Sequence, residues 1–184
     1  RRKQSGTLIW WFKEWLDKNN LYEKAQLIMH TDPKDMHGQD LNHIVERLGL
    51  NQRQVLFSTQ KVSLEKMGIF YNLADVTINI SDAEGFGLST LESLACGTPI
   101  IVNKTGGLQE QVEKGKNKFG VGIEPTSKAV IGSQQVPYIY EDRISQRDFN
   151  RALNKMYKMT RSQRLKIGEA GRKHVMENYN FEDF

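Results

Sequence analysis

The sequence lacks most features that mark extracellular, membrane or metal-dependent proteins. Its 184 residues include one cysteine, so neither an internal disulfide bond nor a cysteine-based zinc site can form. No apolar run approaches the roughly 18 residues that a membrane span needs. There is no tight Asp-x-Asp pair and no histidine cluster. Four residues that lie close together, Asp32, Asp35, His37 and Asp40, are interpreted as a polar loop at a strand end, with a metal site as the alternative.

The first residues, Arg1-Arg2-Lys3-Gln4, include no methionine and no apolar core of a signal peptide. We therefore expect a piece of a longer polypeptide, excised as a single domain over residues 1–184. Apolar residues make up 38% of the chain and charged residues 26%, which is typical of a globular protein with its own core.

The net charge of +4 is unevenly distributed along the chain. Residues 143–174 contain ten Lys or Arg against two Asp or Glu, a local +8, so the remainder sums to −4. The basicity thus belongs to one segment and does not indicate a general polyanion-binding surface, so we expect no nucleic-acid partner. A solvated outer face and peripheral contact with an anionic membrane both remain open for this segment.

Helical and extended patterns alternate along most of the chain. The apolar spacing and the cap residues predict helices over residues 5–18, 40–48, 63–74, 87–95, 106–114 and 145–158, and a last helix from Thr160. Short apolar runs predict strands over residues 27–30, 55–58, 76–80, 99–102 and 120–123. Such an alternation implies a doubly wound α/β fold, a parallel sheet with helices on both faces.

Two predictions concern the C-terminal third of the chain. Residues 124–142 carry turn formers without a clear period and are predicted to form a loop. Thr160-x-x-Gln163 resembles a capping box, and Leu165 and Val175 are predicted to lie on the apolar side of the helix that it opens.

The stretch Asp82–Glu92 carries the most chemical information. It follows a predicted strand and opens a predicted helix, and open parallel sheets bind ligands at the carboxyl ends of their strands. Gly85 and Gly87 allow a ligand to approach the backbone closely, and the amides of a helix N-terminus favour an anion such as phosphate. A glycine-bearing turn of this kind also occurs for packing reasons alone.

Glu92 lies about 40° around the helix from Leu88, at the edge of the apolar stripe. An ionised carboxylate in that position needs hydrogen-bond donors. The vicinal hydroxyls of a sugar would supply two, and a salt bridge to a neighbouring Lys or Arg would serve equally well. Spacing alone leaves both explanations open.

Glu84 and Glu92 are separated by seven residues in EGFGLSTLE, and the segments Ala95–Val102 and Gly106–Glu110 follow. This combination resembles the C-terminal, nucleotide-sugar-binding half of retaining GT-B glycosyltransferases, in particular glycosyltransferase family 4 (group 1). The resemblance covers most of residues 1–123. It implies a Rossmann-like half of a GT-B fold that lacks its first strand and the N-terminal acceptor domain.

The resemblance also assigns roles to individual residues. Glu84 would be the catalytic residue beside the transferred sugar, Glu92 would bind the ribose hydroxyls, and backbone amides of the glycine-rich loop would hold the sugar and the diphosphate. Basic residues before the first helix, where Arg1, Arg2 and Lys3 lie, would bind the diphosphate. Lys3 is the best match for the lysine of the family, and the partner arginine is either Arg2 or a residue that has been cut away. The implied donor-binding residues are Arg2, Lys3, Gly85, Phe86, Gly87, Leu88 and Glu92.

The implied parent enzyme is a hexosyltransferase that moves a sugar from a nucleoside diphosphate sugar to an acceptor hydroxyl, with retention and without metal or cofactor. Its partners would be the nucleotide sugar and the N-terminal domain of the same enzyme, and its location cytoplasmic, with peripheral membrane contact as the alternative. The fragment alone should bind nucleotide weakly and turn over little. A GT-B nucleotide-sugar epimerase and a non-catalytic nucleotide-binding module remain alternatives.

Three further features have plain structural explanations. Three of the four aromatic residues in the cluster Trp10-Trp11-Phe12 with Trp15 fit a helix that packs on a sheet or on a missing neighbour. Cys96 fits a small buried residue at a helix end. Glu110 matches the family's Gly-Gly-x-x-Glu turn, and it equally suits a carboxylate stabilised by a helix dipole.

Overall fold

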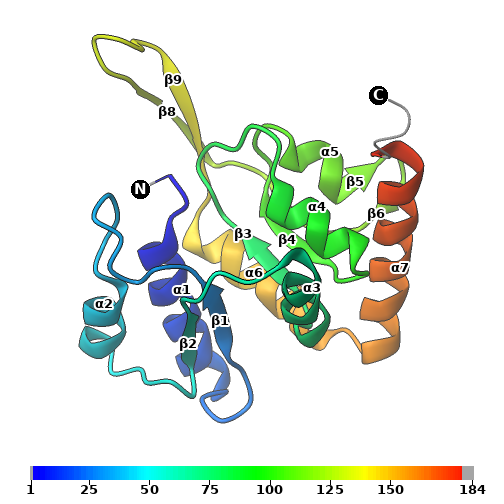
Figure 1. The fold of residues 1–184 in the computed structure, drawn as a ribbon, viewed down its shortest axis with the longest axis horizontal. Coiled ribbons are helices and arrows are strands. Elements are labelled where there is room, and N and C mark those ends of the chain that lie inside the picture. Colours follow the sequence, from blue (N-terminus) through cyan, green and yellow to red (C-terminus); the bar gives the residue numbers. More distant parts are fainter. Residues whose placement is uncertain (1, 180–184) are drawn as a thin grey trace. The chain divides into compact units, whose positions relative to one another are not determined.

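The computed structural model describes residues 2–179, and the chain divides into two compact units, Arg1–Lys61 and Val62–Phe184 (Figure 1). Both units combine parallel strands with flanking helices, so the predicted α/β class is confirmed. All five predicted strands are present and parallel, but they are divided between a two-stranded and a three-stranded sheet.

The first unit contains a two-stranded parallel sheet and two helices, in the order α1 (Ser5–Asn19), β1 (Leu27–His30), α2 (Leu41–Arg47) and β2 (Val55–Ser58). In the sheet, Leu27 lies opposite Val55. The N-terminus of α2 is capped by the Asp40 side chain, which accepts a hydrogen bond from the His43 amide. In α1 the aromatic cluster contributes Phe12 and Trp15 to the buried face, whereas Trp10 is 48% exposed.

The second unit is built on the parallel sheet β3–β4–β7. The central strand β4 is buried along its whole length, as expected of a strand covered on both faces. The elements of this unit are α3 (Leu64–Leu73), β3 (Thr77–Asn79), α4 (Leu88–Ala95), β4 (Ile100–Asn103), α5 (Leu108–Val112), β5 (Glu113–Lys114), β6 (Asn117–Lys118), β7 (Gly120–Ile123), β8 (Ser127–Ile131), β9 (Ile139–Arg143), α6 (Gln146–Lys158) and α7 (Arg161–Asn178).

Helix α7 begins with the predicted capping box, in which Thr160 and Gln163 each satisfy a backbone amide of the other. The prediction for its buried face is only half right: Val175 is buried, but Leu165 is 51% exposed. The buried positions include Gly168 and Gly171, and a Cβ at Gly171 would lie 2.6 Å from Leu94 Cδ2 of α4. Small residues therefore allow the two helices to pack closely, and an apolar-spacing rule overlooks them.

The predicted loop over residues 124–142 is wrong, because most of this segment forms an antiparallel hairpin. Strands β8 and β9 pair over five positions, from Ser127 opposite Arg143 to Ile131 opposite Ile139. The hairpin extends away from the helices of its unit (Figure 1). Residues 131–140 are all exposed, so most of the ribbon gains no stability from a core, and its sequence shows little of the alternation that identifies a half-buried strand.

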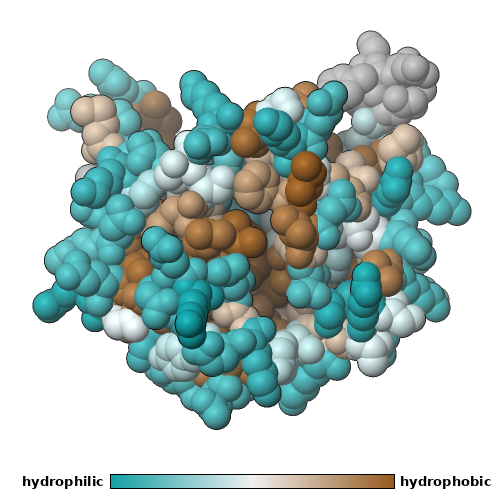
Figure 2. All heavy atoms as spheres, turned by 60° about the horizontal axis from the view of Figure 1, so that its bottom comes forward, coloured by the Kyte–Doolittle hydropathy of each residue, from teal (hydrophilic) through white to brown (hydrophobic). Residues whose placement is uncertain are grey.

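The surface is largely hydrophilic, with apolar residues gathered at a few places on the face drawn in Figure 2. On α3, the apolar residues Leu64 and Leu73 are 82% and 70% exposed, whereas Tyr71 is the buried residue of this helix. No helix among residues 2–179 combines the length and the apolar character needed to cross a membrane.

Candidate functional site

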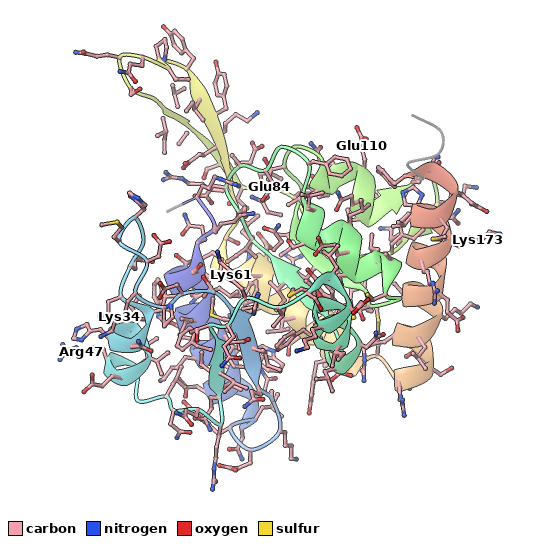
Figure 3. The ribbon with its side chains drawn as sticks, in the orientation of Figure 1. Lys34, Arg47, Lys61, Glu84, Glu110 and Lys173 are labelled. Carbon is pink, nitrogen blue, oxygen red and sulfur yellow. The ribbon has the colours of Figure 1, made fainter. Side chains whose placement is uncertain are left out.

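The loop between β3 and α4 carries the glycine-rich motif. The chain leaves β3 through a turn in which Asn79 Oδ1 accepts hydrogen bonds from the Ser81 amide (3.1 Å) and the Ser81 hydroxyl (2.6 Å). Both residues are buried, so the start of the loop is fixed within the core. Glu84, which follows, is half-buried, and Figure 3 shows it on this loop, with Glu110 on α5 of the same unit.

The turn after β4 packs directly against this loop. The Gly107 amide donates a hydrogen bond to the Gly85 carbonyl (3.0 Å). A Cβ at Gly107 would lie 2.7 Å from the Phe86 carbonyl oxygen, and a Cβ at Gly106 would overlap the carbonyl oxygen of Glu84. Glycine is therefore required at both positions for close approach, and the two segments of the family pattern form one structure.

Two buried polar side chains form hydrogen bonds with backbone carbonyls of this loop. Gln111 of α5 is fully buried and donates from Nε2 to the Phe86 carbonyl (2.7 Å). The Thr90 hydroxyl, also buried, lies 2.8 Å from the Gly87 carbonyl and 2.6 Å from Gln111 Oε1. Because each buried polar group has a partner, this network fixes the backbone of the motif.

The upper side of the loop is open to solvent. Gly87 is buried with φ +88°, but Gly85, Phe86, Leu88 and Ser89 are exposed. Gly87 is the N-cap of α4, and as a glycine it provides no side chain to cap the amides of this helix. Those amides carry the positive end of the helix dipole, so the exposed edge of the loop favours an anion.

Gly85 differs from the other glycines of the site. Its φ does not lie in the left-handed region, and a Cβ built on it meets no atom within 4 Å apart from its chain neighbours, among the residues that the structure describes. Neither backbone conformation nor internal packing thus calls for glycine at this position. A methyl group at position 85 would therefore enter open space.

Glu92 receives a donor that the sequence did not reveal. The Tyr71 hydroxyl of α3 donates to Glu92 Oε2 over 2.8 Å, so a protein hydroxyl satisfies this oxygen, which is neither of the two explanations that spacing left open. Burial, followed by the hydrogen bond to Glu92, raises the pKa of Tyr71 well above its ordinary value. Tyr71 therefore remains a donor at every physiological pH and holds one carboxylate oxygen of Glu92 in place.

The base of the hairpin meets the site at Asp142. Its amide donates to the Asp82 carbonyl (2.7 Å), and its Oδ2 accepts a hydrogen bond from the Thr105 hydroxyl (2.8 Å). Asn103, fully buried at the end of β4, donates from Nδ2 to the carbonyls of Ser81 (2.8 Å) and Asp142 (2.6 Å). Sequence reasoning missed these contacts; the only signal was a polar Asn at the end of an apolar strand.

The basic side chain at the end of β4 is engaged elsewhere. Lys104 Nζ lies 2.7 Å from Glu113 Oε1 and 2.5 Å from Glu124 Oε1, and these hydrogen bonds raise its pKa. Across residues 2–179, no three His, Cys, Asp or Glu side chains are grouped so that they could hold a metal ion. The arrangement around the loop therefore offers backbone amides, two carboxylates and open space.

The structure places the candidate residues in two groups. Residues 84–88 and Glu92 come together in the second unit, on the loop and first turns of α4. Arg2 and Lys3 belong to the first unit, where both are exposed in the turn before α1. Arg1, the first residue of the same basic run, lies outside the described residues.

Comparison with known proteins identifies relatives. The family model "Glycosyl transferases group 1" matches residues 18–131, more than half of the chain. D-inositol 3-phosphate glycosyltransferase from Corynebacterium jeikeium is 40% identical over 90 residues, which cover 48% of this chain and 21% of that protein. The chain thus spans only about a fifth of the length of this relative.

Solved structures share the fold. Sucrose-phosphate synthase from Thermosynechococcus elongatus matches all of this chain, and 40% of that one, with a TM-score of 0.71 and 23% identity. The C-terminal domain of a glycosyl transferase group 1 family protein from Francisella tularensis matches 98% of this chain and 81% of that one, with a TM-score of 0.69 and 21% identity. The structural neighbours are GT-B glycosyltransferases, and the predicted fold is confirmed. On the strength of the family match, this chain belongs to the group 1 family of glycosyl transferases.

Proposed function

We propose that the second unit binds a nucleoside diphosphate sugar at the loop 84–88, and that the parent enzyme transfers its hexose to an acceptor hydroxyl with retention of the anomeric configuration. The observation that carries the proposal is the open space beside Gly85, next to the N-terminus of α4, where the N-cap residue is a glycine. A glycine that neither strain nor packing explains fits a position where a ligand touches the backbone.

The roles follow from the chemistry of each group. Departure of a nucleoside diphosphate develops negative charge, which the amides at the start of α4 are oriented to stabilise. Glu84 lies on the same loop and accepts hydrogen bonds from hydroxyls of the sugar. The anomeric carbon of this sugar gains positive charge as its bond to the diphosphate breaks. The family resemblance assigns Arg2 and Lys3 to the diphosphate as well, and their positive charge would take the place of a metal or a cofactor.

Glu92 binds the ribose hydroxyls through the carboxylate oxygen that Tyr71 does not occupy. The hydrogen bond from Tyr71 fixes Oε2, which leaves Oε1 as the acceptor that a ligand would use. A carboxylate held in this way loses little side-chain entropy when the ligand binds. The N-terminal domain of the parent enzyme supplies the acceptor site, in the cytoplasm or at the cytoplasmic membrane surface.

Calorimetric titration with a ligand series tests the proposal. UDP, UDP-glucose, GDP and GDP-mannose are titrated into the wild-type chain and into the Gly85→Ala, Glu84→Gln and Gly68→Ala variants. Gly85→Ala should weaken binding of the preferred nucleotide at least about tenfold without lowering the melting temperature, because its methyl group enters the ligand space. Gly68→Ala is the matched control, since its methyl group meets only Cys96 Sγ at 3.9 Å.

The ligand pairs separate the two halves of the donor. Glu84→Gln should weaken binding of the nucleotide sugar and leave binding of the nucleoside diphosphate unchanged, because Glu84 contacts the sugar alone. Equal binding of all ligands by wild type and Gly85→Ala would contradict the proposed site. Retention is tested by NMR of the product of the full-length enzyme: an α-linked donor must give an α-linked product.

A further inference from the structure

We infer that Asp142, at the base of the β8–β9 hairpin, is a positioning residue for the sugar-transfer site. The inference rests on the proposed function and adds to it a residue that lies outside the motif, 50 positions after Glu92 in the chain. Its basis is that Asp142 connects the two loops that together form the site, and that it does so with both its backbone and its side chain.

The first set of contacts reaches the motif loop. The Asp142 amide donates to the carbonyl of Asp82, two residues before Glu84, over 2.7 Å. Asp82 is 5% exposed, so this hydrogen bond lies inside the protein, where water does not compete for it. This hydrogen bond therefore fixes the position of the backbone where the chain enters the turn that carries Glu84.

The second set of contacts reaches the turn after β4. Asp142 Oδ2 accepts a hydrogen bond from the Thr105 hydroxyl over 2.8 Å, and Thr105 is 4% exposed. The Asp142 carbonyl accepts from Asn103 Nδ2 over 2.6 Å, and the same nitrogen donates to Ser81. Asn103 thus links the end of β3, the end of β4 and the hairpin through one buried amide.

These contacts complete a closed circuit around the motif. Thr105 is followed by Gly106 and Gly107, which lie against the backbone of Glu84, Gly85 and Phe86. From Asp142 the circuit runs to Asp82, along the loop to Gly85, across to Gly107 and back through Thr105. A circuit of short contacts, some of them buried, leaves the Glu84 backbone little freedom, and removal of one member releases the rest.

The hairpin has few other attachments that would explain this residue. On its own ribbon, Asp142 pairs with Lys128, with Oδ1 and Nζ 3.5 Å apart, and Lys128 is 61% exposed. Such an exposed pair contributes little, so the part-buried hydrogen bond from Thr105 accounts for the carboxylate. Asp142 is therefore placed to transmit the position of the hairpin to the site, although no part of it belongs to the glycine-rich motif.

The test compares turnover of Asp142→Ala, Asp142→Asn and Lys128→Ala in the full polypeptide that carries this chain. Release of UDP or GDP from UDP-glucose, UDP-N-acetylglucosamine and GDP-mannose is measured, with active protein counted by nucleotide-binding stoichiometry. Asp142→Ala should lower kcat about 10- to 100-fold with a less than threefold change in the donor KM, because displacement of a catalytic group by about 1 Å acts mainly on the transition state. Asp142→Asn retains an acceptor for Thr105 and should recover most of the loss, and Lys128→Ala should behave as wild type.

A second variant separates positioning from folding. Thr105→Val removes the hydroxyl that donates a hydrogen bond to Asp142 and should reproduce the kcat loss of Asp142→Ala. The double variant should lose no more activity than either single variant. A kcat within twofold of wild type for active Asp142→Ala, or a loss confined to the amount of active protein, would overturn the inference while the proposed function stands. If the wild-type enzyme releases no nucleotide from any of the three donors, the proposed function fails and the inference falls with it.

Discussion

Replacing Gly107 by alanine probes the contact between the two loops of the site. Gly107 has φ −63°, which alanine adopts without strain, so any effect comes from the new methyl group. That group would lie 2.7 Å from the Phe86 carbonyl oxygen and 2.8 Å from the Gly85 carbonyl oxygen, closer than the 3.0 Å below which real Cβ contacts essentially never fall. Both neighbours are backbone atoms of the motif, so the loop itself must move.

The size of the effect follows from this geometry. Relief of the contact needs a shift of the loop by about 0.5 Å, and overpacking of this kind costs about 1–3 kcal/mol. For a chain of this length the melting temperature should therefore fall by roughly 2–12 °C. Because a misplacement of about 1 Å can cost about 100-fold in rate, half that shift predicts a loss of about tenfold in turnover of the full-length enzyme.

The assay pairs thermal unfolding with turnover, and Gly68→Ala again serves as control. Gly68 lies inside α3 in open surroundings, so alanine there should raise stability by up to about 1 kcal/mol and leave turnover unchanged. The contrast with Gly85→Ala is informative, since that variant should lose binding without losing stability. A Gly107→Ala protein as stable and as active as wild type would refute the rigid contact between the loops.

Three further predictions concern Tyr71 and Lys3. Tyr71→Phe should lower the free energy of unfolding by about 1–2 kcal/mol in denaturant titrations, because Glu92 loses its donor in a half-buried setting. The raised pKa of Tyr71 means that below pH 10 the hydroxyl is protonated in both folded and unfolded states, whereas above pH 10 the unfolded state loses its proton first. The free energy of unfolding should therefore fall as the pH rises above 10 in wild type, and by less in Tyr71→Phe; equal slopes would contradict the raised pKa. Lys3→Ala should weaken nucleoside diphosphate binding about 3- to 10-fold, and more in low salt than in high salt, whereas unchanged affinity would remove Lys3 from the site.

Sequence periodicity predicted those elements whose residues make local contacts. Strands at residues 27–30, 55–58 and 120–123 agree with the structure residue for residue, because each is a short apolar run between turn formers. The hairpin over residues 127–143 was missed because its residues are mostly exposed and do not alternate, so pairing between its own strands is what orders it. The buried face of α7 was misjudged at Leu165 because its buried positions include Gly168 and Gly171, and an apolar pattern ignores glycine.

The motif itself was predictable, but its support was not. Glu84, Glu92 and the glycines between them lie within nine consecutive residues, and a family pattern connects them directly. The contacts that hold them come from far along the chain: Tyr71 lies 21 residues from Glu92, Gln111 lies 25 from Phe86, and Asp142 lies 37 from Thr105. No periodic rule relates such positions, since only the folded sheet brings them together.

The most direct test of the account is to map where a nucleotide contacts this chain. Backbone amide signals of isotope-labelled protein are followed by NMR while UDP, GDP and their hexose derivatives are added. The account predicts that the amides of Gly85–Ser89 shift most, with smaller changes at Gly106 and Gly107 and none on the outer hairpin around Tyr138. Unchanged amide signals of residues 85–89 at saturating nucleotide would contradict the claim that this loop binds the sugar donor.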